Sequence, residues 1–188
     1  MTSDTIISIF LGIGLAASAG FRVFLPLFVL SLVTYLDMWQ LNESWGWIGS
    51  LGALIIFGVA MVAEIFAYYI PWFDNLLDSI AIPLATIAGT AVMVSTVADM
   101  TPAITWTLAI IAGGGTATAI KGAASATRLT STATTGGVGN PVVSTIETGT
   151  SMLVSVASVF LPVLAVVLVI IILFVVFLFY RKIRPRRK

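Results

Sequence analysis

The chain contains no cysteine and no histidine, and these two absences exclude several kinds of functional site. Without them the protein has no thiol nucleophile, no imidazole general base and no zinc site built from cysteine and histidine. A metal bound to this chain would be a hard ion held by carboxylate, amide or hydroxyl oxygens. We therefore expect no cofactor other than such a cation, and no enzyme activity.

Charged residues are also scarce, and apolar residues take their place. Only 9% of the residues are charged and 59% are hydrophobic, which gives a mean hydropathy of +1.11. An ordinary soluble domain carries about 25% charged residues. The apolar residues form continuous runs, without the alternation of polar and apolar positions that a membrane barrel needs. The composition predicts an integral membrane protein built from α-helices.

Apolar runs follow one another at residues 5–36, 48–70, 76–98, 102–120 and 147–180. A straight membrane span needs about 20 residues, so the middle three runs fit one span each. The first and last runs are too long, and each contains helix breakers: Gly20 and Pro26 in the first, Pro162 in the last. Each is either one kinked helix or two helices that meet at a turn. We predict an all-α polytopic membrane protein with about five to seven transmembrane or half-membrane helices, broken near Pro26 and Pro162.

The two long runs share the letters VFLP, at residues 23–26 and 159–162. One interpretation is a chance match between apolar segments. The other is an internal duplication with an interrupted helix in each half, and paired interrupted helices are typical of a transporter binding site. The sequence leaves both interpretations open.

Basic residues are concentrated at the C-terminus, where the last eight positions hold six of the nine Lys and Arg residues. Because cytoplasmic segments of membrane proteins are enriched in Lys and Arg, we expect this end to be cytoplasmic. We therefore divide the chain into one helical membrane domain, residues 1–180, and a basic cytoplasmic tail, residues 181–188. The lipid bilayer is the expected partner of this chain, and nucleic acid is not.

Four charged residues lie inside or at the edge of apolar runs: Arg22, Glu64, Asp78 and Glu147. A charge at the centre of a bilayer costs about 2.5–3.5 kcal/mol on insertion scales, so such residues usually face a protein interior or a water-filled cavity and are paired. We expect Arg22 to pair with one of the three carboxylates, either as part of a site or to hold two helices in register.

The turn near Pro71 would bring Glu64 and Asp78 to similar depths on neighbouring helices. Two close carboxylates there would suit a proton or a hard cation, and any metal would be bound by these two residues. Asp74 is spaced i, i+4 from Asp78 and therefore shares its helix face. The alternative is that Asp74 or Asn75 caps the next helix and Asp78 lies at a wet interface.

A second group of candidates surrounds the polar segment 121–141, which is rich in Ser, Thr and Gly. We expect a helix that starts at Pro141, with Asn140 as its N-cap and with Ser144 and Glu147 on one stripe. The start of this helix, together with Arg128, could receive an anion. The alternative is a solvated loop followed by an ordinary helix start. The small residues of segment 113–124 predict close helix packing, within the chain or in a homo-oligomer.

Three blocks of the sequence carry a family resemblance: GLAASAGFRVFLPLFVLSL, then AEIFAYYIPWFDNLLDSIAIPLATIAGT, then RLTSTATTGGVGNPVVSTIET. In this order they resemble a family of small bacterial integral membrane proteins catalogued as domain of unknown function 4126. The resemblance implies a multi-pass bacterial membrane protein and supplies no assigned activity or substrate. We expect the chain to lie in the bacterial cytoplasmic (inner) membrane. The three blocks contain most of the candidates above: Arg22, Glu64, Asp74, Asp78, Arg128, Asn140 and Glu147.

Three functions fit these observations, and we place a transporter or channel for a small ion or polar solute first. It predicts a polar cavity that joins Glu64, Asp78 and Glu147. In it Glu64 and Asp78 would bind the ion, Asn140 and Ser144 would add neutral ligands, and Glu147 would pair with Arg22 or Arg128 to control access.

The second function is a non-catalytic, lipid-binding or scaffold subunit of a membrane complex. It predicts charges that pair in a dry core and an apolar groove open to lipid. The third function is an enzyme acting on a lipid phosphate through Arg128, Ser131, Thr132 and Asn140, and no motif supports it.

Overall fold

The structure, a computed structural model, describes residues 2–98 and 100–183. In this part of the chain every regular element is helical. The first half contains α1 (Ser3–Phe21), α2 (Phe24–Tyr35), the 3₁₀ helix η1 (Glu43–Gly49), α3 (Leu51–Ala67) and α4 (Pro71–Thr96). The second half contains α5 (Pro102–Leu108), the π-helical turn η2 (Ala109–Gly114), α6 (Gly115–Thr135), α7 (Asn140–Phe160) and α8 (Pro162–Ile183).

Four helices are long and apolar enough to cross a membrane: α1, the Leu76–Thr96 part of α4, the continuous helix Pro102–Thr135, and α7. A fifth crossing results if η1 and α3, which meet at a bend of 63°, are counted as one span. The helices α2 and α8 are also apolar, but their apolar stretches, Phe24–Tyr35 and Pro162–Leu178, have only 10–17 residues. The prediction of an all-α, multi-pass membrane protein is confirmed.

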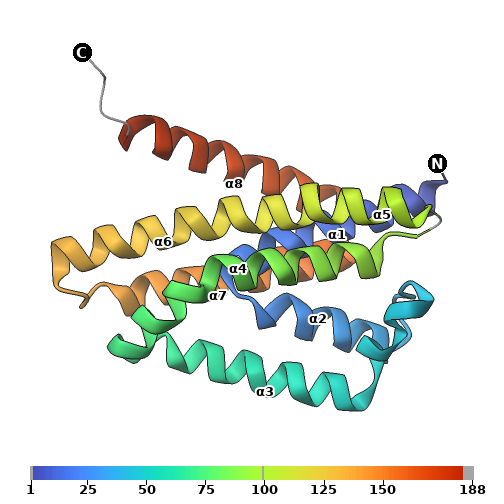
Figure 1. Cartoon of the computed structure of the whole chain (residues 1–188), viewed down its shortest axis with the longest axis horizontal. Helices are drawn as coiled ribbons and strands as arrows, with labels where there is room; N and C mark the ends of the chain where they lie inside the picture. Colours follow the sequence, from blue (N-terminus) through green and yellow to red (C-terminus); the bar gives the residue numbers. More distant parts are fainter. Residues whose placement is uncertain (1, 99, 184–188) are drawn as a thin grey trace.

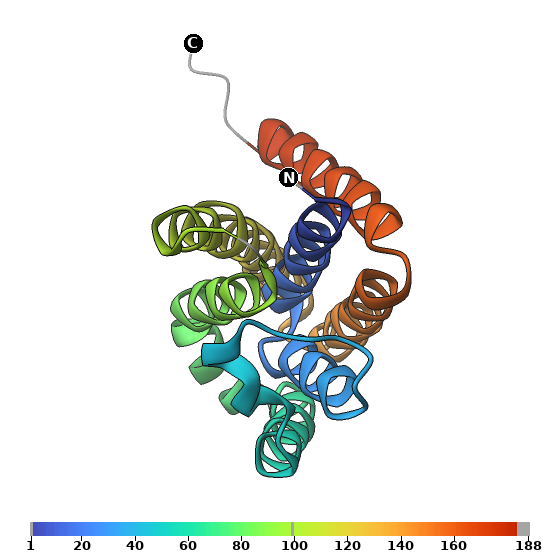
Figure 2. The same cartoon turned by 90° about the vertical axis from the view of Figure 1, so that its right-hand side faces the viewer.

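The helices form a bundle with α1 at its centre (Figures 1 and 2). Viewed along the bundle, α2, α4, α6, α7 and α8 surround α1, and α3 lies outside α2 and α4. Every residue of α1 from Leu11 to Gly20 except Ile13 is buried. The connections α3–α4 and α6–α7 lie at one end of the bundle, which we call the α6–α7 end. The end of α8 lies on this side too, and the N-terminus lies at the opposite end.

The first long run is two helices that meet at a turn, because α2 runs back along the bundle from the end of α1 (Figure 1). The tip of this hairpin is Arg22, whose backbone is extended at φ −135° and ψ 122°. Pro26 is the third residue of α2, where its missing N–H breaks no helical hydrogen bond. The last run also breaks as expected, at Leu161, and Pro162 is the first residue of α8.

The polar segment 121–141 differs from the expectation of a loop, because α6 continues through it to Thr135. Thr127, Thr130 and Thr134 each donate a hydrogen bond to the carbonyl four residues earlier, so their hydroxyls are satisfied within the helix. The chain reverses only at Gly136 and Gly137, whose φ angles of 63° and 91° favour glycine. These glycines therefore form the turn that ends α6.

Small residues allow the helices around α1 to approach closely. A Cβ atom at Gly89 of α4 would lie 2.8 Å from the carbonyl oxygen of Gly113 and 2.6 Å from the Cβ of Ala117. The small-residue face that the sequence predicts is therefore used for packing within the chain. On the other side of α1, the Ser18 hydroxyl lies 2.7 Å from that of Ser151 in α7.

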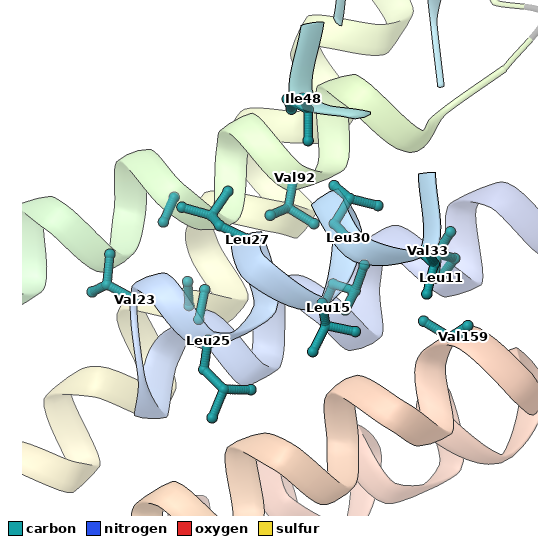
Figure 3. Packing of buried hydrophobic residues seen from close by; sticks show 14 of the residues in the cluster. Leu11, Leu15, Val23, Leu25, Leu27, Leu30, Val33, Ile48, Val92 and Val159 are labelled. Carbon is teal, nitrogen blue, oxygen red and sulfur yellow. The ribbon is translucent and has the colours of Figure 1, made fainter. Parts of the chain in front are cut away.

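Apolar side chains fill the space between these contacts, near the α1–α2 hairpin. Figure 3 shows Leu15 of α1 and Leu30 of α2 packing with Val92 of α4. Val159 of α7 belongs to the same cluster. This core holds the hairpin in place and so fixes the position of its tip.

Candidate functional site

Most of the candidate residues meet at the α6–α7 end of the bundle. They come from the hairpin tip, the last turn of α3, the first turns of α4 and α7, and the middle of α6. We call the seven charged residues gathered there the buried charge cluster: Arg22, Glu64, Asp74, Asp78, Lys121, Arg128 and Glu147. Six of them are buried to at least nine-tenths, and Asp78 is half-buried.

Arg128 is the centre of this cluster and links three helices. Its Nε donates a hydrogen bond of 3.1 Å to Oε1 of Glu147, and one terminal nitrogen donates to Oε2 of the same carboxylate. The other terminal nitrogen donates to Oδ1 of Asp74 in α4. A guanidinium group presents a planar fork that fits a carboxylate with two parallel bonds. The side chain is only 1% exposed, so water competes little for these bonds.

Tyr68 directly follows α3, and its ring contacts two guanidinium groups. The Cζ atoms of Arg22 and Arg128 lie 4.2 Å and 4.1 Å from the ring centroid. The Tyr68 hydroxyl accepts a hydrogen bond of 3.1 Å from Nζ of Lys121, which is fully buried.

Sequence reasoning did not identify Tyr68 or Lys121 as part of the site. One signal was present for each of them. Tyr68 follows Glu64 by four residues, and Lys121 precedes Arg128 by seven, so each shares a helix face with a charged candidate.

Arg22 is held at the hairpin tip by α7. Its Nε donates to the Thr148 hydroxyl at 2.9 Å, and a terminal nitrogen donates to the Ser144 carbonyl oxygen at 2.9 Å and to the Ser144 hydroxyl. Its partner among the carboxylates is Glu147, at 3.9 Å. Glu147 therefore pairs with both arginines, and the predicted stripe of Ser144 and Glu147 along α7 faces them.

Glu64 has a contact that no sequence pattern predicts, because its partners are backbone groups. Its two carboxylate oxygens accept hydrogen bonds from the N–H groups of Val23 and Phe24, at 2.8 Å and 2.9 Å. These N–H groups begin α2, where a helix has no internal acceptor for them. A side chain of α3 thus caps a helix of the hairpin, and the negative charge is also favoured by the α2 dipole.

The start of α4 differs from the prediction. Its N-cap is Ile70, so the alternative in which Asp74 or Asn75 caps this helix is wrong. Asp74 lies one turn further along, because α4 begins at Pro71, and its carboxylate binds Arg128 and the Asn140 amide, the latter at 2.9 Å. The side chain of Asn75 lies outside the described part of the structure.

Asn140 also differs from its predicted role, because α7 begins at Asn140 itself and its N-cap is Gly139. The Asn140 side chain makes no cap and instead bridges two neighbouring helices. Its amide nitrogen donates to Asp74 in α4 and, at 3.0 Å, to the Thr132 hydroxyl in α6.

A polar pocket of about 250 Å³ lies beside the cluster, between α4 and α6. We call it the Asp78 pocket, and it is lined by Asp78, Ser79, Ser125, Arg128, Leu129, Thr132 and Asn140. Oδ1 of Asp78 and the Ser125 hydroxyl are both buried, yet neither has a hydrogen-bond partner. Buried polar atoms are nearly always paired with protein or ordered water, so these two oxygens are available to a water, an ion or a polar solute in the pocket. Ser79, Leu129 and Thr132 are exposed and form the mouth of the pocket.

The candidate carboxylates are divided among several pockets of the described part. Asp78 lines the polar pocket, Glu64 lines an apolar pocket between α3 and α4, and Glu147 lines an apolar groove between α6, α7 and α8. Among the described residues, no three carboxylates gather closely enough to hold a metal ion.

A family model matches the chain over residues 9–182. The chain belongs to this family. Its description is Domain of unknown function (DUF4126), and it names no activity. No curated protein and no solved structure matches the chain. The function of this DUF4126 protein therefore has to be inferred from its own site.

Proposed function

We propose that this DUF4126 protein is a transporter or channel, and that a small ion or polar solute passes through the Asp78 pocket. The observation that carries the proposal is the pair of buried, unpartnered oxygens, on Asp78 and Ser125, that line a polar pocket in a chain otherwise dominated by apolar residues. Buried polar atoms of a structural network are usually paired with other protein groups or with ordered water. In a membrane protein a buried ionisable group is expensive, and it commonly marks a solute or ion pathway.

The interrupted hairpin α1–α2 supports the proposal. Transporters bind solutes where membrane helices are broken, because the broken ends offer polar groups within the bilayer. Here the ends are already occupied: Glu64 accepts from the first N–H groups of α2, and Arg22 binds α7. We therefore assign the hairpin tip to the wall of the pathway, and we assign solute contact to Asp78 and Ser125. This proposal places Glu64 outside the solute site.

In this proposal the basic residues at the C-terminus indicate how the protein is oriented in the membrane. The end of α8 lies at the α6–α7 end of the bundle, and the residues from Arg181 onward are predominantly basic. By the positive-inside rule this end faces the cytoplasm, so the Asp78 pocket opens toward the cytoplasmic side of the bacterial inner membrane. In this proposal the chain moves a solute and catalyses no reaction.

The test is solute flux into proteoliposomes, with protons, alkali cations and small polar solutes offered in turn. We expect Asp78→Asn to reduce the flux at least tenfold. The amide of Asn lacks the negative charge, and its NH₂ group is a donor in place of one carboxylate oxygen of Asp78, which is an acceptor. Asp37→Asn is the matched control, since Asp37 is exposed in the α2–η1 connection, at the opposite end of the bundle. The Asp78→Asn protein should elute as a single species. If its flux is then unchanged, the solute does not pass through the Asp78 pocket.

A second function is favoured by the groove between α6, α7 and α8, which the alternative of a lipid-binding subunit predicts. The groove has a volume of about 330 Å³, and residues of all three helices, such as Ala124, Val143 and Ile172, give it an almost wholly apolar lining. Glu147 also lines the groove, and its carboxylate is already bound to Arg128. A lipid that copurifies in a fixed ratio and is lost in Ala124→Trp, with no solute flux in any variant, would favour this function over transport.

A further inference from the structure

The buried charge cluster does not balance, and this determines what the Asp78 pocket can bind. The cluster contains three cationic side chains, Arg22, Lys121 and Arg128, and four carboxylates. In their ordinary ionised forms one negative charge therefore remains without a counter-charge. The other titratable side chain in contact with the cluster is Tyr68, which is neutral as a phenol and only accepts from Lys121. A carboxylate that has lost part of its hydration and has no counter-charge is unfavourable, so one more positive charge beside the cluster would stabilise it.

The unbalanced charge can be assigned to Asp78 from the contacts of the other carboxylates. Glu64 accepts from two backbone N–H groups, Asp74 binds Arg128 and Asn140, and Glu147 binds both arginines. These three carboxylates are occupied on both oxygens. Asp78 is the carboxylate of the cluster whose Oδ1 is left without a partner. The missing positive charge therefore belongs in the Asp78 pocket.

The lining of the pocket limits which cation fits. The Ser125 hydroxyl has no partner, and Thr132 and Asn140 add further oxygens, so the pocket offers the oxygen ligands that hard cations prefer. The cluster has one excess negative charge, so a monovalent cation balances it, whereas a divalent ion would leave one excess positive charge. An anion would meet the negative Asp78, while the positive Arg128 is already neutralised by Asp74 and Glu147.

We propose that the Asp78 pocket binds one monovalent cation, with Asp78 and Ser125 as its principal contacts. This inference rests on the pocket of the proposed function and specifies its solute class. The single positive charge is supplied by an alkali-metal ion or by a small alkylammonium. A proton at Asp78 balances the same charge and competes with either cation. Cation binding is therefore weakened as the pH falls.

The experiment is equilibrium binding to the full chain purified in detergent. Three labelled cations are used in separate arms: sodium, rubidium as the analogue of potassium, and methylammonium. We expect one of them to bind saturably at one per chain, and the arm that does so identifies the source of the charge. Asp78→Asn is expected to weaken binding at least tenfold and Ser125→Ala about threefold, while Asp37→Asn leaves it unchanged.

The outcomes separate this inference from the proposed function. Saturable binding of chloride or phosphate that depends on Asp78, or the absence of binding by all three cations, would overturn the inference. If a neutral or anionic solute shows a flux that Asp78→Asn abolishes, the transport function is supported and the inference of a bound cation is wrong. If a cation binds but no solute shows flux in proteoliposomes, the inference of a cation site is supported and the proposed transport function is wrong. Because Ser125→Ala keeps the charge balance, it tests the pocket even if Asp78→Asn misfolds.

Discussion

Removing the Glu64 carboxylate tests whether this residue holds the hairpin. In Glu64→Ala the N–H groups of Val23 and Phe24 lose their only side-chain acceptor, since the N-cap position of α2 provides none. A buried N–H without an acceptor costs about 1–3 kcal/mol, and loss of a helix N-cap costs about 0.5–2 kcal/mol. Because these two estimates describe overlapping contacts, we expect a total loss of about 3 kcal/mol for Glu64→Ala.

Glu64→Gln should cost less, about 1 kcal/mol, because its amide oxygen still accepts one of the two hydrogen bonds. For a chain of this length, a loss of about 3 kcal/mol lowers the Tm by about 6–12 °C. The Tm in detergent measures the stability. Amide hydrogen exchange gives a local readout, because Val23 and Phe24 should exchange faster in Glu64→Ala while α7 is unchanged.

The control for these variants is Glu43→Ala, which removes an exposed carboxylate from η1. We expect its Tm to stay within about 2 °C of the unmodified chain, because substitutions of exposed residues usually change stability by less than about 0.5 kcal/mol. If Glu64→Ala were as stable as the unmodified chain and exchanged Val23 and Phe24 no faster, then Glu64 would not be a cap, and its predicted role as an ion ligand would return.

Two further predictions concern the site and the packing around α1. In Tyr68→Phe the ring contacts with the guanidinium groups remain but Lys121 loses its hydroxyl partner, so we expect a loss of about 1–3 kcal/mol; an unchanged unfolding free energy would show that Lys121 finds another acceptor. Gly89→Ala places a Cβ 2.8 Å from the Gly113 carbonyl oxygen and should cost about 1–3 kcal/mol, whereas Gly115→Ala meets nothing within 4 Å and should be neutral or stabilising. Equal Tm values for these two glycine variants would contradict the close packing of α4 against η2.

The charged candidates could be identified from sequence because of where they lie. Arg22, Glu64, Asp78 and Glu147 interrupt apolar runs, and the cost of a charge in a bilayer makes such positions informative without any structure. The bonds between the arginines and Glu147 were predicted for the same reason, since each buried charge needs a partner of opposite sign. The helix breaks near Pro26 and Pro162 followed from the missing N–H of proline.

The remaining features depend on contacts that have no signature in sequence. The partners of Glu64 are backbone N–H groups, which every residue except proline carries. Tyr68 resembles any aromatic residue near the end of an apolar run, and only the fold brings two guanidinium groups to its ring. The helix at residues 121–135 was missed because Ser, Thr and Gly favour loops. Its tertiary contacts through Lys121 and Arg128 outweigh that propensity.

The hairpin tip has a consequence for the order in which the chain is assembled during synthesis. Arg22 is made 122 to 126 residues before its hydrogen-bond partners on α7. At a rate of about 5–20 residues per second, this guanidinium waits about 6–25 s before Ser144 and Thr148 emerge from the ribosome. Glu64 arrives earlier, so the α2 end of the hairpin is capped while Arg22 is still unpaired. The contacts that Arg22 makes with α7 therefore form late, after the core of α1, α2 and α4 has been synthesised.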